Sequence, residues 1–246
     1  METENEAVRR SVVRVRFDAS GKVLSYYNDA FDLKPGDIVY VEGKLEGERG
    51  RVIDVAYNFR IKVSDYKRVI GKADTDVHGT LHMAGSHFVT FNRDVLPYDK
   101  VITWFKAPDK AGDEYVSGTD STSAALDDLT AFKISPEIYD RGCDYYRNNK
   151  VRYLCVDGGH GRAIVEGTKP YELEFDLRDG QIGSLTCSCY CSNTCKHEVA
   201  LILQLRETLA YIKENFPRHS GYFAAVNTVT FFLFAMDGKK AGSIKL

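Results

Sequence analysis

The sequence contains no long hydrophobic run. Its longest apolar stretches, residues 199–203 and 230–236, are far shorter than the roughly 20 residues that a membrane-spanning helix needs. Residues 1–6 are polar and acidic, with no basic segment leading into an apolar one. This start excludes a secretory signal peptide of the usual pattern. We therefore expect a cytoplasmic protein that has no membrane partner.

An excess of charge of one sign is also missing. The chain carries 33 Lys and Arg against 35 Asp and Glu, a net charge of −2. Residues 1–130 have 18 basic against 22 acidic side chains, and residues 131–246 have 15 against 13. Obligate nucleic-acid-binding domains are usually strongly basic, and neither half is. Any contacts with phosphate must therefore come from a local patch.

Motifs that carry catalysis are absent as well. The sequence has no Gly-x-x-x-x-Gly-Lys-Ser/Thr loop for a nucleotide phosphate, and no nucleophile–base or carboxylate pair stands out. His197-Glu198 begins like a metalloprotease helix, but position 201 is Leu where the second histidine would stand. We predict that the protein is not an enzyme.

The N-terminal part has the composition of short strands and turns. Strand-like apolar or alternating patterns occur at residues 11–17, 38–41 and 51–57. A strong turn signal, Lys34-Pro35-Gly36-Asp37, and a glycine-spaced polar connection at residues 42–50 separate them. Short strands separated by such turns predict a small β-barrel-like domain or a curled sheet.

Further strand-like stretches occur at residues 88–91 and 101–105, and we expect them to extend the N-terminal sheet. Three histidines lie in the same region, at positions 78, 82 and 87; a second metal site there is an alternative, although no ligand spacing here is diagnostic of one. Residues 107–128 are polar and rich in Gly, Ser, Thr and Asp, which is typical of a linker.

The part after this linker predicts an α+β arrangement. Ser135-Pro136-Glu137 combines a capping serine, a proline suited to the first helical position and a glutamate that favours the positive end of the helix dipole, so a helix should run to about Arg147. Apolar runs at residues 151–156, 163–165 and 171–177, separated by glycine turns, then predict an antiparallel meander.

Residues 182–186 lead the chain from this meander into a cysteine cluster. After His197 the apolar residues recur every three or four positions as far as Phe216, which predicts a helix that Pro217 stops. Residues 227–236 fit either the first arm of a hairpin, with a turn at Asp237-Gly238 and a second arm at 239–246, or a short helix.

The expected organisation therefore has four parts. They are a β-rich N-terminal domain, a linker, a zinc-finger module and a C-terminal extension, at residues 1–106, 107–128, 129–216 and 217–246.

The cysteine cluster has the spacing of a metal site. Residues 187–197 contain a Cys-x-Cys pair, a short interval and a Cys-x-His pair. Zinc takes four sulfur or nitrogen donors at tetrahedral corners, and a short loop lets the second pair return to the first. Without a signal peptide the thiols stay reduced, which favours a metal over disulfides. We predict one structural zinc ion held by Cys187, Cys189, Cys195 and His197.

Cys191 is a fifth donor within the same loop. It is an alternative ligand that could replace Cys187 or Cys189. We favour a spare thiol, because the Cys187/Cys189 pair directly follows the end of a strand. Such a loop thiol should be sensitive to oxidation.

These residues resemble the SWIM zinc fingers, whose pattern is CxCx(n)CxH running into a helix. Cys187, Cys189, Cys195 and His197 match its four ligand positions, and residues 141–147 look like the region upstream of the finger in bacterial members. The resemblance covers roughly residues 131–216 and implies a ββα-type finger after the meander. Residues 1–130 are not explained by it.

The resemblance implies binding to DNA or another nucleic acid, or to protein, often beside a helicase-like ATPase of the Swi/Snf kind. We expect the chain to be a shortened form of a longer architecture, or to pair with a separate partner. The alternative function is a protein-interaction adaptor with a purely structural zinc. Candidate phosphate contacts are Arg147, Lys150, Arg152, Lys196, Arg206 and Lys213.

Overall fold

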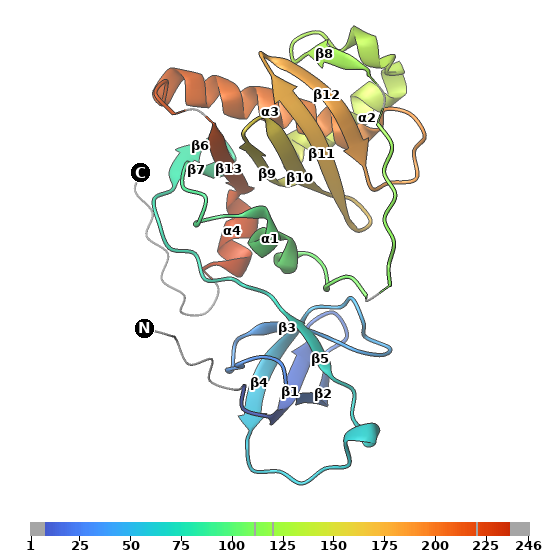
Figure 1. Cartoon of the computed structure of the whole chain (residues 1–246), viewed down its shortest axis with the longest axis vertical. Coiled ribbons are helices and arrows are strands. Elements are labelled where there is room, and N and C mark those ends of the chain that lie inside the picture. Colours follow the sequence, from blue (N-terminus) through green and yellow to red (C-terminus); the bar gives the residue numbers. More distant parts are fainter. Residues whose placement is uncertain (1–7, 111, 120, 220, 237–246) are drawn as a thin grey trace. The chain divides into compact units, whose positions relative to one another are not determined.

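The computed structural model describes residues 8–110, 112–119, 121–219 and 221–236 (Figure 1). The chain divides into two compact units. Unit 1 comprises the residues up to Asp74 together with Ile102–Asp113, and unit 2 comprises Thr75–Val101 and the chain from Glu114 onward. This division differs from the expected one, because residues 75–101 belong with the C-terminal part and the expected linker is shared between the units.

Unit 1 is built on one five-stranded antiparallel sheet. Its order is β2-β1-β4-β3-β5. The strands and a 3₁₀ turn, η1, have these bounds: β1 Ser11–Phe17, β2 Lys22–Asn28, β3 Ile38–Val41, β4 Gly50–Ala56, η1 Val63–Asp65 and β5 Val69–Lys72. Val13, Val15 and Phe17 alternate into the core while Arg14 and Arg16 face solvent, which is the two-residue period of a half-buried strand.

The sheet of unit 1 is not a closed barrel. In the described residues, its end strands β2 and β5 form no ladder with each other, and a single isolated bridge joins Tyr27 of β2 to Arg68, the residue before β5. The strand pattern in the sequence therefore indicated β1, β3 and β4 correctly but did not identify β2 or β5, and the sheet does not close into a barrel.

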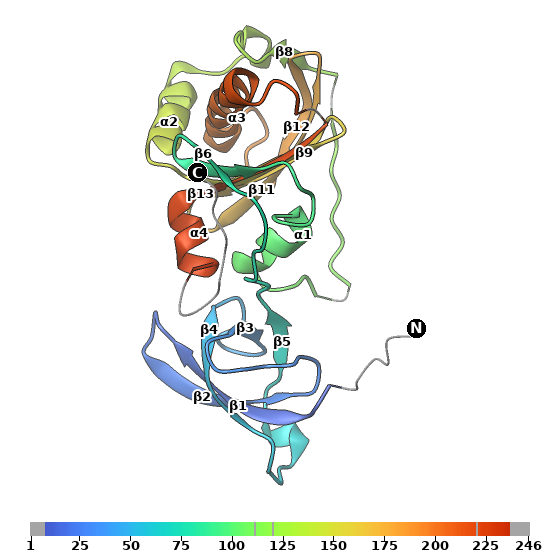
Figure 2. The same cartoon turned by 90° about the vertical axis from the view of Figure 1, so that its left-hand side faces the viewer.

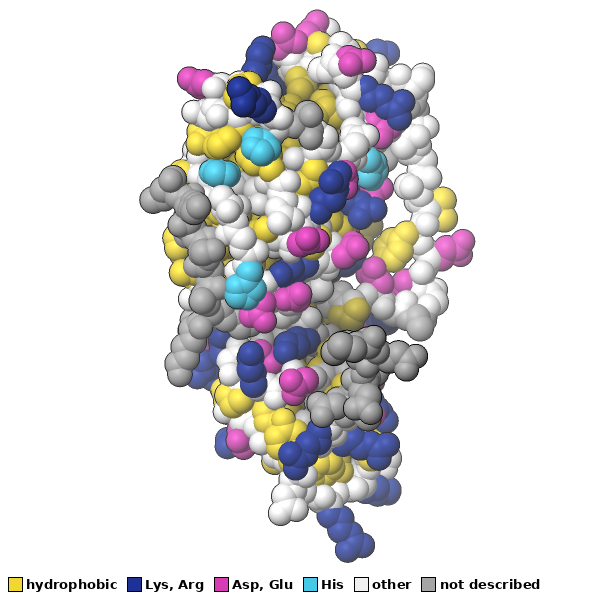
Figure 3. Space-filling model, turned by 60° about the vertical axis from the view of Figure 1, so that its left-hand side comes forward, with side chains coloured by type: hydrophobic (Ala, Val, Ile, Leu, Met, Phe, Trp, Pro, Cys, Tyr) yellow, Lys and Arg dark blue, Asp and Glu magenta, His cyan; other side chains and the backbone are white. Residues whose placement is uncertain are grey.

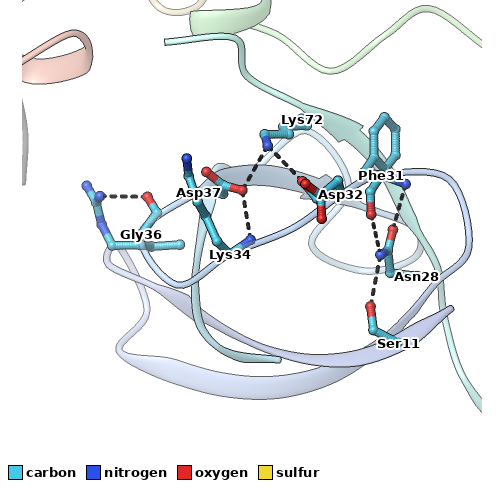
Figure 4. A network of polar contacts seen from close by, with 9 residues as sticks. Ser11, Asn28, Phe31, Asp32, Lys34, Gly36, Asp37 and Lys72 are labelled. Atoms are coloured by element: carbon cyan, nitrogen blue, oxygen red, sulfur yellow. Dashed lines mark hydrogen bonds and ion pairs between the residues drawn. The ribbon is translucent and has the colours of Figure 1, made fainter. Parts of the chain in front are cut away.

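The turn at Lys34–Asp37 is fixed by buried polar contacts (Figure 4). The carboxylate of Asp37 is buried and accepts hydrogen bonds from Lys34 N at 3.0 Å and from Lys72 Nζ at 2.9 Å. Gly36 has a φ of 99°, a conformation that side chains disfavour. Asn28 Nδ2 donates to Ser11 Oγ at 2.9 Å and to Phe31 O at 2.7 Å, and Asn28 Oδ1 accepts from Phe31 N at 3.1 Å. These contacts secure the connections that lead into the sheet.

Unit 2 is built on an eight-stranded antiparallel sheet with the order β6-β7-β13-β9-β10-β11-β12-β8. Its strands are β6 His82–Ala84, β7 His87–Thr90, β8 Ser123–Ala125, β9 Val151–Asp157, β10 His160–Glu166, β11 Pro170–Arg178, β12 Gln181–Cys187 and β13 Tyr222–Asn227. The helices of the described part are α1 Tyr98–Val101, α2 Pro136–Arg147, α3 Lys196–Asn215 and α4 Thr228–Phe234. Short 3₁₀ turns occur at Ile102–Trp104 in unit 1 and at Thr130–Phe132 in unit 2.

Helices cover both faces of this sheet. α2 and α3 lie on one face, and α1 and α4 lie on the other (Figure 2). The main core forms under α3, where Leu201 and Leu205 join the buried side chains of the meander, such as Leu154, Val165 and Phe175. The packing of α3 on the sheet therefore fixes the first turn of this helix relative to the end of β12.

Several predicted elements are confirmed and others are wrong. The helix after Ser135, the meander and the helix after His197 are present. Residues 101–104 are helical rather than extended, and residues 87–90 pair with β13 instead of extending the N-terminal sheet. Of the two alternatives for residues 227–236, the structure has the short helix α4; the expected turn and second arm lie outside the described residues. No helix in the described ranges has the length and apolarity required to cross a membrane.

Candidate metal centre

The end of β12 and the start of α3 bring four donor side chains together. Cys187 ends β12, Cys189 follows in the loop, Cys195 caps α3 and His197 lies in its first turn. The donor atoms of these four residues all lie within 4.8 Å of one another. Cys195 and His197 are buried, while Cys187 and Cys189 are half-buried.

The distances within this group fit a tetrahedral ion. His197 Nδ1 lies 3.7 Å from Cys187 Sγ and 3.6 Å from Cys195 Sγ. Zinc–sulfur bonds of about 2.3 Å and zinc–nitrogen bonds of about 2.0–2.1 Å place neighbouring sulfur and nitrogen donors about 3.6 Å apart at tetrahedral angles. The group can therefore close around one metal ion.

The start of α3 favours negative charge on sulfur. Cys195 is the N-cap, and Glu198 completes a capping box by accepting a hydrogen bond from Cys195 N at 2.6 Å. Hydrogen bonds with Cys187 and His197 lower the pKa of Cys195 to about 3, whereas the bond to Cys195 and burial raise the pKa of Cys187. A metal ion that binds here displaces the remaining thiol protons. Burial and the Cys195 thiolate raise the pKa of Glu198 to about 8.

Two tyrosines hold the imidazole of His197. Tyr171 stacks on it at a centroid distance of 4.2 Å, and Tyr145 meets it edge-on at 5.3 Å. Gly167 leaves room for this stack, because a Cβ there would lie 2.7 Å from the Tyr171 ring and 3.3 Å from His197 Nε2. Nothing in the local sequence pattern marked Gly167 or Tyr171, because their roles arise only when β10 and β11 pair beside α3.

Cys191 lies outside this group. Its side chain is exposed, in the loop between the two ligand pairs. Ser188, on the other side of Cys189, is tied to β11: Ser188 N donates to Glu172 O and Ser188 Oγ accepts from Glu172 N, both at 2.9 Å. The base of the loop is therefore anchored, while the thiol of Cys191 faces solvent.

The structure does not gather the six candidate phosphate contacts. Arg152 forms an ion pair with Glu166 and also contacts Asn227, and Arg147 pairs with Asp144 at 3.4 Å.

Lys196 lies over the Tyr145 ring at 4.6 Å at the start of α3, and Lys213 lies about 25 Å away near the end of that helix. Lys150 and Arg206 are half-buried. On the face shown in Figure 3, basic and acidic side chains are interspersed over the upper part, and several basic side chains lie together at the lower end.

The three histidines of residues 78–87 do not converge. His87 is fully buried and its Nε2 bonds Val151 O at 3.0 Å; His82 packs on Phe216 at 4.5 Å; His78 is exposed. Within the part of the chain that the structure describes, the group at residues 187–197 is the one set of metal-binding side chains that come close together.

Fold and site together define a mixed α/β protein with a zinc-finger-like Cys₃His centre. Among known proteins, no family model matches this chain and no solved structure matches it. An uncharacterized protein of Methanocaldococcus jannaschii is 37% identical over 74 residues, which is 30% of this chain and 31% of that protein. The chain thus matches less than a third of the length of this relative, and the likeness carries no function by itself.

Proposed function

We propose that this chain is a SWIM-type zinc-binding module that binds DNA or another nucleic acid, as an accessory to a helicase-like ATPase. The observation that carries the proposal is the compact Cys₃His group at the junction of β12 and α3. One donor pair begins at the end of a strand and the other lies at the start of a helix, and this arrangement supports the proposal of a SWIM-type finger.

The zinc in this proposal is structural. Catalytic zinc sites usually keep a position open for water, whereas three thiolates and one imidazole fill all four. The ion would fasten the last meander strand to the helix that covers it, so its binding free energy would contribute to folding. A closed shell also supports a role other than catalysis.

Metal analysis of the purified chain tests the zinc. We expect close to one equivalent of zinc in the wild type, a large loss in His197→Ala and little change in Cys191→Ser. The serine variant is the matched control because Cys191 lies in the same loop but outside the donor group. Loss of zinc in Cys191→Ser with retention in His197→Ala would contradict this ligand set.

Support for nucleic acid comes from the SWIM-like spacing and from the cation Lys196, which lies between the ligands Cys195 and His197 at the start of α3. Because phosphate contacts release counterions, the logarithm of the affinity should fall linearly with the logarithm of the salt concentration. We expect a clear negative slope for an oligonucleotide bound to the zinc-loaded chain. A slope near zero would exclude a phosphate-driven interaction.

A specific feature favours a second candidate, a protein-interaction adaptor. α4 packs Phe231 and Phe234 inward but exposes Val229, Phe232 and Leu233, and Met236, just after the helix, is exposed as well. Exposed apolar patches often mark protein contacts. For this function, a partner should co-purify with the chain after nuclease treatment and be lost in Leu233→Asp.

A further inference from the structure

We propose that the loop between the two ligand pairs is a stacking site for an unpaired base, so that the partner is single-stranded nucleic acid. Tyr190 supplies the aromatic platform and Lys169 the neighbouring positive charge. This inference rests on the proposed function and specifies its partner and its contact residue.

Tyr190 is held out in solvent. Its side chain is 97% exposed, more than any other large hydrophobic residue in the described part of the chain. Tyrosine usually buries most of its ring and keeps only its hydroxyl near water, so an entire ring in water is unusual. A free aromatic face of this kind is suited to receive another planar ring.

The backbone that leads into Tyr190 is fixed at the two residues before it, Ser188 and Cys189. Ser188 is bonded to β11 through its backbone and its hydroxyl, both at 2.9 Å, and Cys189 belongs to the metal-binding group. A platform whose backbone is already ordered loses little conformational freedom when a ligand stacks on it. The metal centre would therefore serve to position the loop.

Positive charge lies beside this ring. Lys169 Nζ is 5.8 Å from the Tyr190 centroid and 5.7 Å from that of Tyr171, the ring stacked on His197. Lys196 adds a second cation near the centre, over Tyr145. These two lysines would offset the formal charge of −1 of a zinc ion with three thiolates and leave positive charge for a phosphate.

The combination favours single strands over duplex. Bases within a duplex are stacked on one another, so a protein ring can reach their faces only at ends or after unpairing. Proteins that bind single strands pair aromatic side chains for the bases with cations for the backbone. Tyr190 and Lys169 provide one group of each kind.

The test measures binding of a labelled single-stranded oligonucleotide, and of the duplex of the same sequence, to the full zinc-loaded chain by fluorescence anisotropy. We expect tighter binding of the single strand. Tyr190→Ala should weaken it at least about fivefold, whereas Tyr190→Phe, which keeps the ring, should stay within about twofold of the wild type. Lys169→Ala should make the salt slope shallower by about one.

Tyr139→Ala is the matched control, because Tyr139 is an exposed tyrosine on α2 and should leave binding unchanged. Zinc content and circular dichroism verify that each variant is folded. If the wild type binds nucleic acid but Tyr190→Ala binds equally well, or if the duplex is preferred, this inference is overturned and the proposed function stands. If the wild type binds neither the single strand nor the duplex, this inference and the proposed function both fail.

Discussion

At the scale of single residues, His87 shows how burial changes what a side chain does. Its Nε2 faces the carbonyl oxygen of Val151 at 3.0 Å and must donate, so Nδ1 accepts from the Ser86 hydroxyl at 3.0 Å. Burial lowers the pKa of His87 to about 4, and the nearby Arg152 acts in the same direction. The residue is a neutral core histidine rather than a metal ligand.

This burial predicts a pH-dependent stability. The pKa of His87 in the folded state lies below the usual value near 6.5, so the unfolded state binds the proton more tightly. The contribution of His87 is therefore complete above about pH 6.5 and is lost as the pH falls toward 4, by about 2 kcal/mol at pH 5. Chemical denaturation at a series of pH values measures it.

Two variants test whether His87 causes this pH dependence of stability. His87→Gln should have a flatter dependence of unfolding free energy on pH between 4 and 6.5, whereas His78→Gln, a change at an exposed histidine, should follow the wild type. Equal slopes in wild type and His87→Gln would show that another group governs the acid sensitivity.

At the scale of elements, the pair α2–α3 depends on one close approach. A Cβ on Gly142 would lie 2.4 Å from Val199 Cβ and 3.2 Å from Lys196 O. Gly142 therefore lets α2 lie against the first turn of α3, which carries His197. The closeness of the two helices is part of what supports the metal centre.

Gly142→Ala should consequently destabilise unit 2. The gain in helix propensity is about 1 kcal/mol, but overpacking costs about 1–3 kcal/mol and displaces Val199, two residues from a ligand. We expect a lower urea midpoint and weaker zinc retention. Gly118→Ala is the control, since a Cβ there meets no atom within 4 Å. A Gly142→Ala variant as stable as the control would contradict tight helix packing.

The elements that the sequence predicted well are those with local signals. Ser135 caps α2 and its hydroxyl accepts from Ile138 N, as the Ser-Pro-Glu start suggested. The ligand spacing at 187–197 is equally local, so the candidate site could be inferred without the fold. The roles of Tyr171 and Gly167 could not be inferred in this way, because their contacts with His197 depend on strand pairing.

Elements set by distant partners were missed. Residues 101–105 have a strand-like composition, yet they continue from α1 into a 3₁₀ turn, where Val101 and Trp104 are buried. β7 looked like an extension of the N-terminal sheet because no local pattern identifies β13, the partner on one of its two sides, which lies more than 130 residues later. Pairing over such distances is a property of the whole fold.

At the scale of the whole molecule, each unit has its own hydrophobic core. The only tryptophan in the sequence, Trp104, is fully buried and lies in a segment assigned to unit 1, where its Nε1 donates to Asp74 O, and the metal centre belongs to unit 2. Fluorescence of Trp104 therefore reports on unit 1, while far-ultraviolet circular dichroism reports on both units.

Removal of zinc should accordingly affect one unit. Circular dichroism should record the unfolding of unit 2, and a chelator should lower the temperature of that transition. The reason is that a bound metal stabilises only the folded state. The transition followed through Trp104 should not move. An equal shift in both signals would mean that the two units unfold together.

The position of β13 has a consequence for synthesis on the ribosome. This strand, Tyr222–Asn227, lies between β7 and β9, so residues 87–90 emerge long before the strand that joins them to the meander. Until then β7 and β9 present open edges, which are prone to pair with other chains. The nascent protein should need protection by chaperones until its last described strand leaves the exit tunnel.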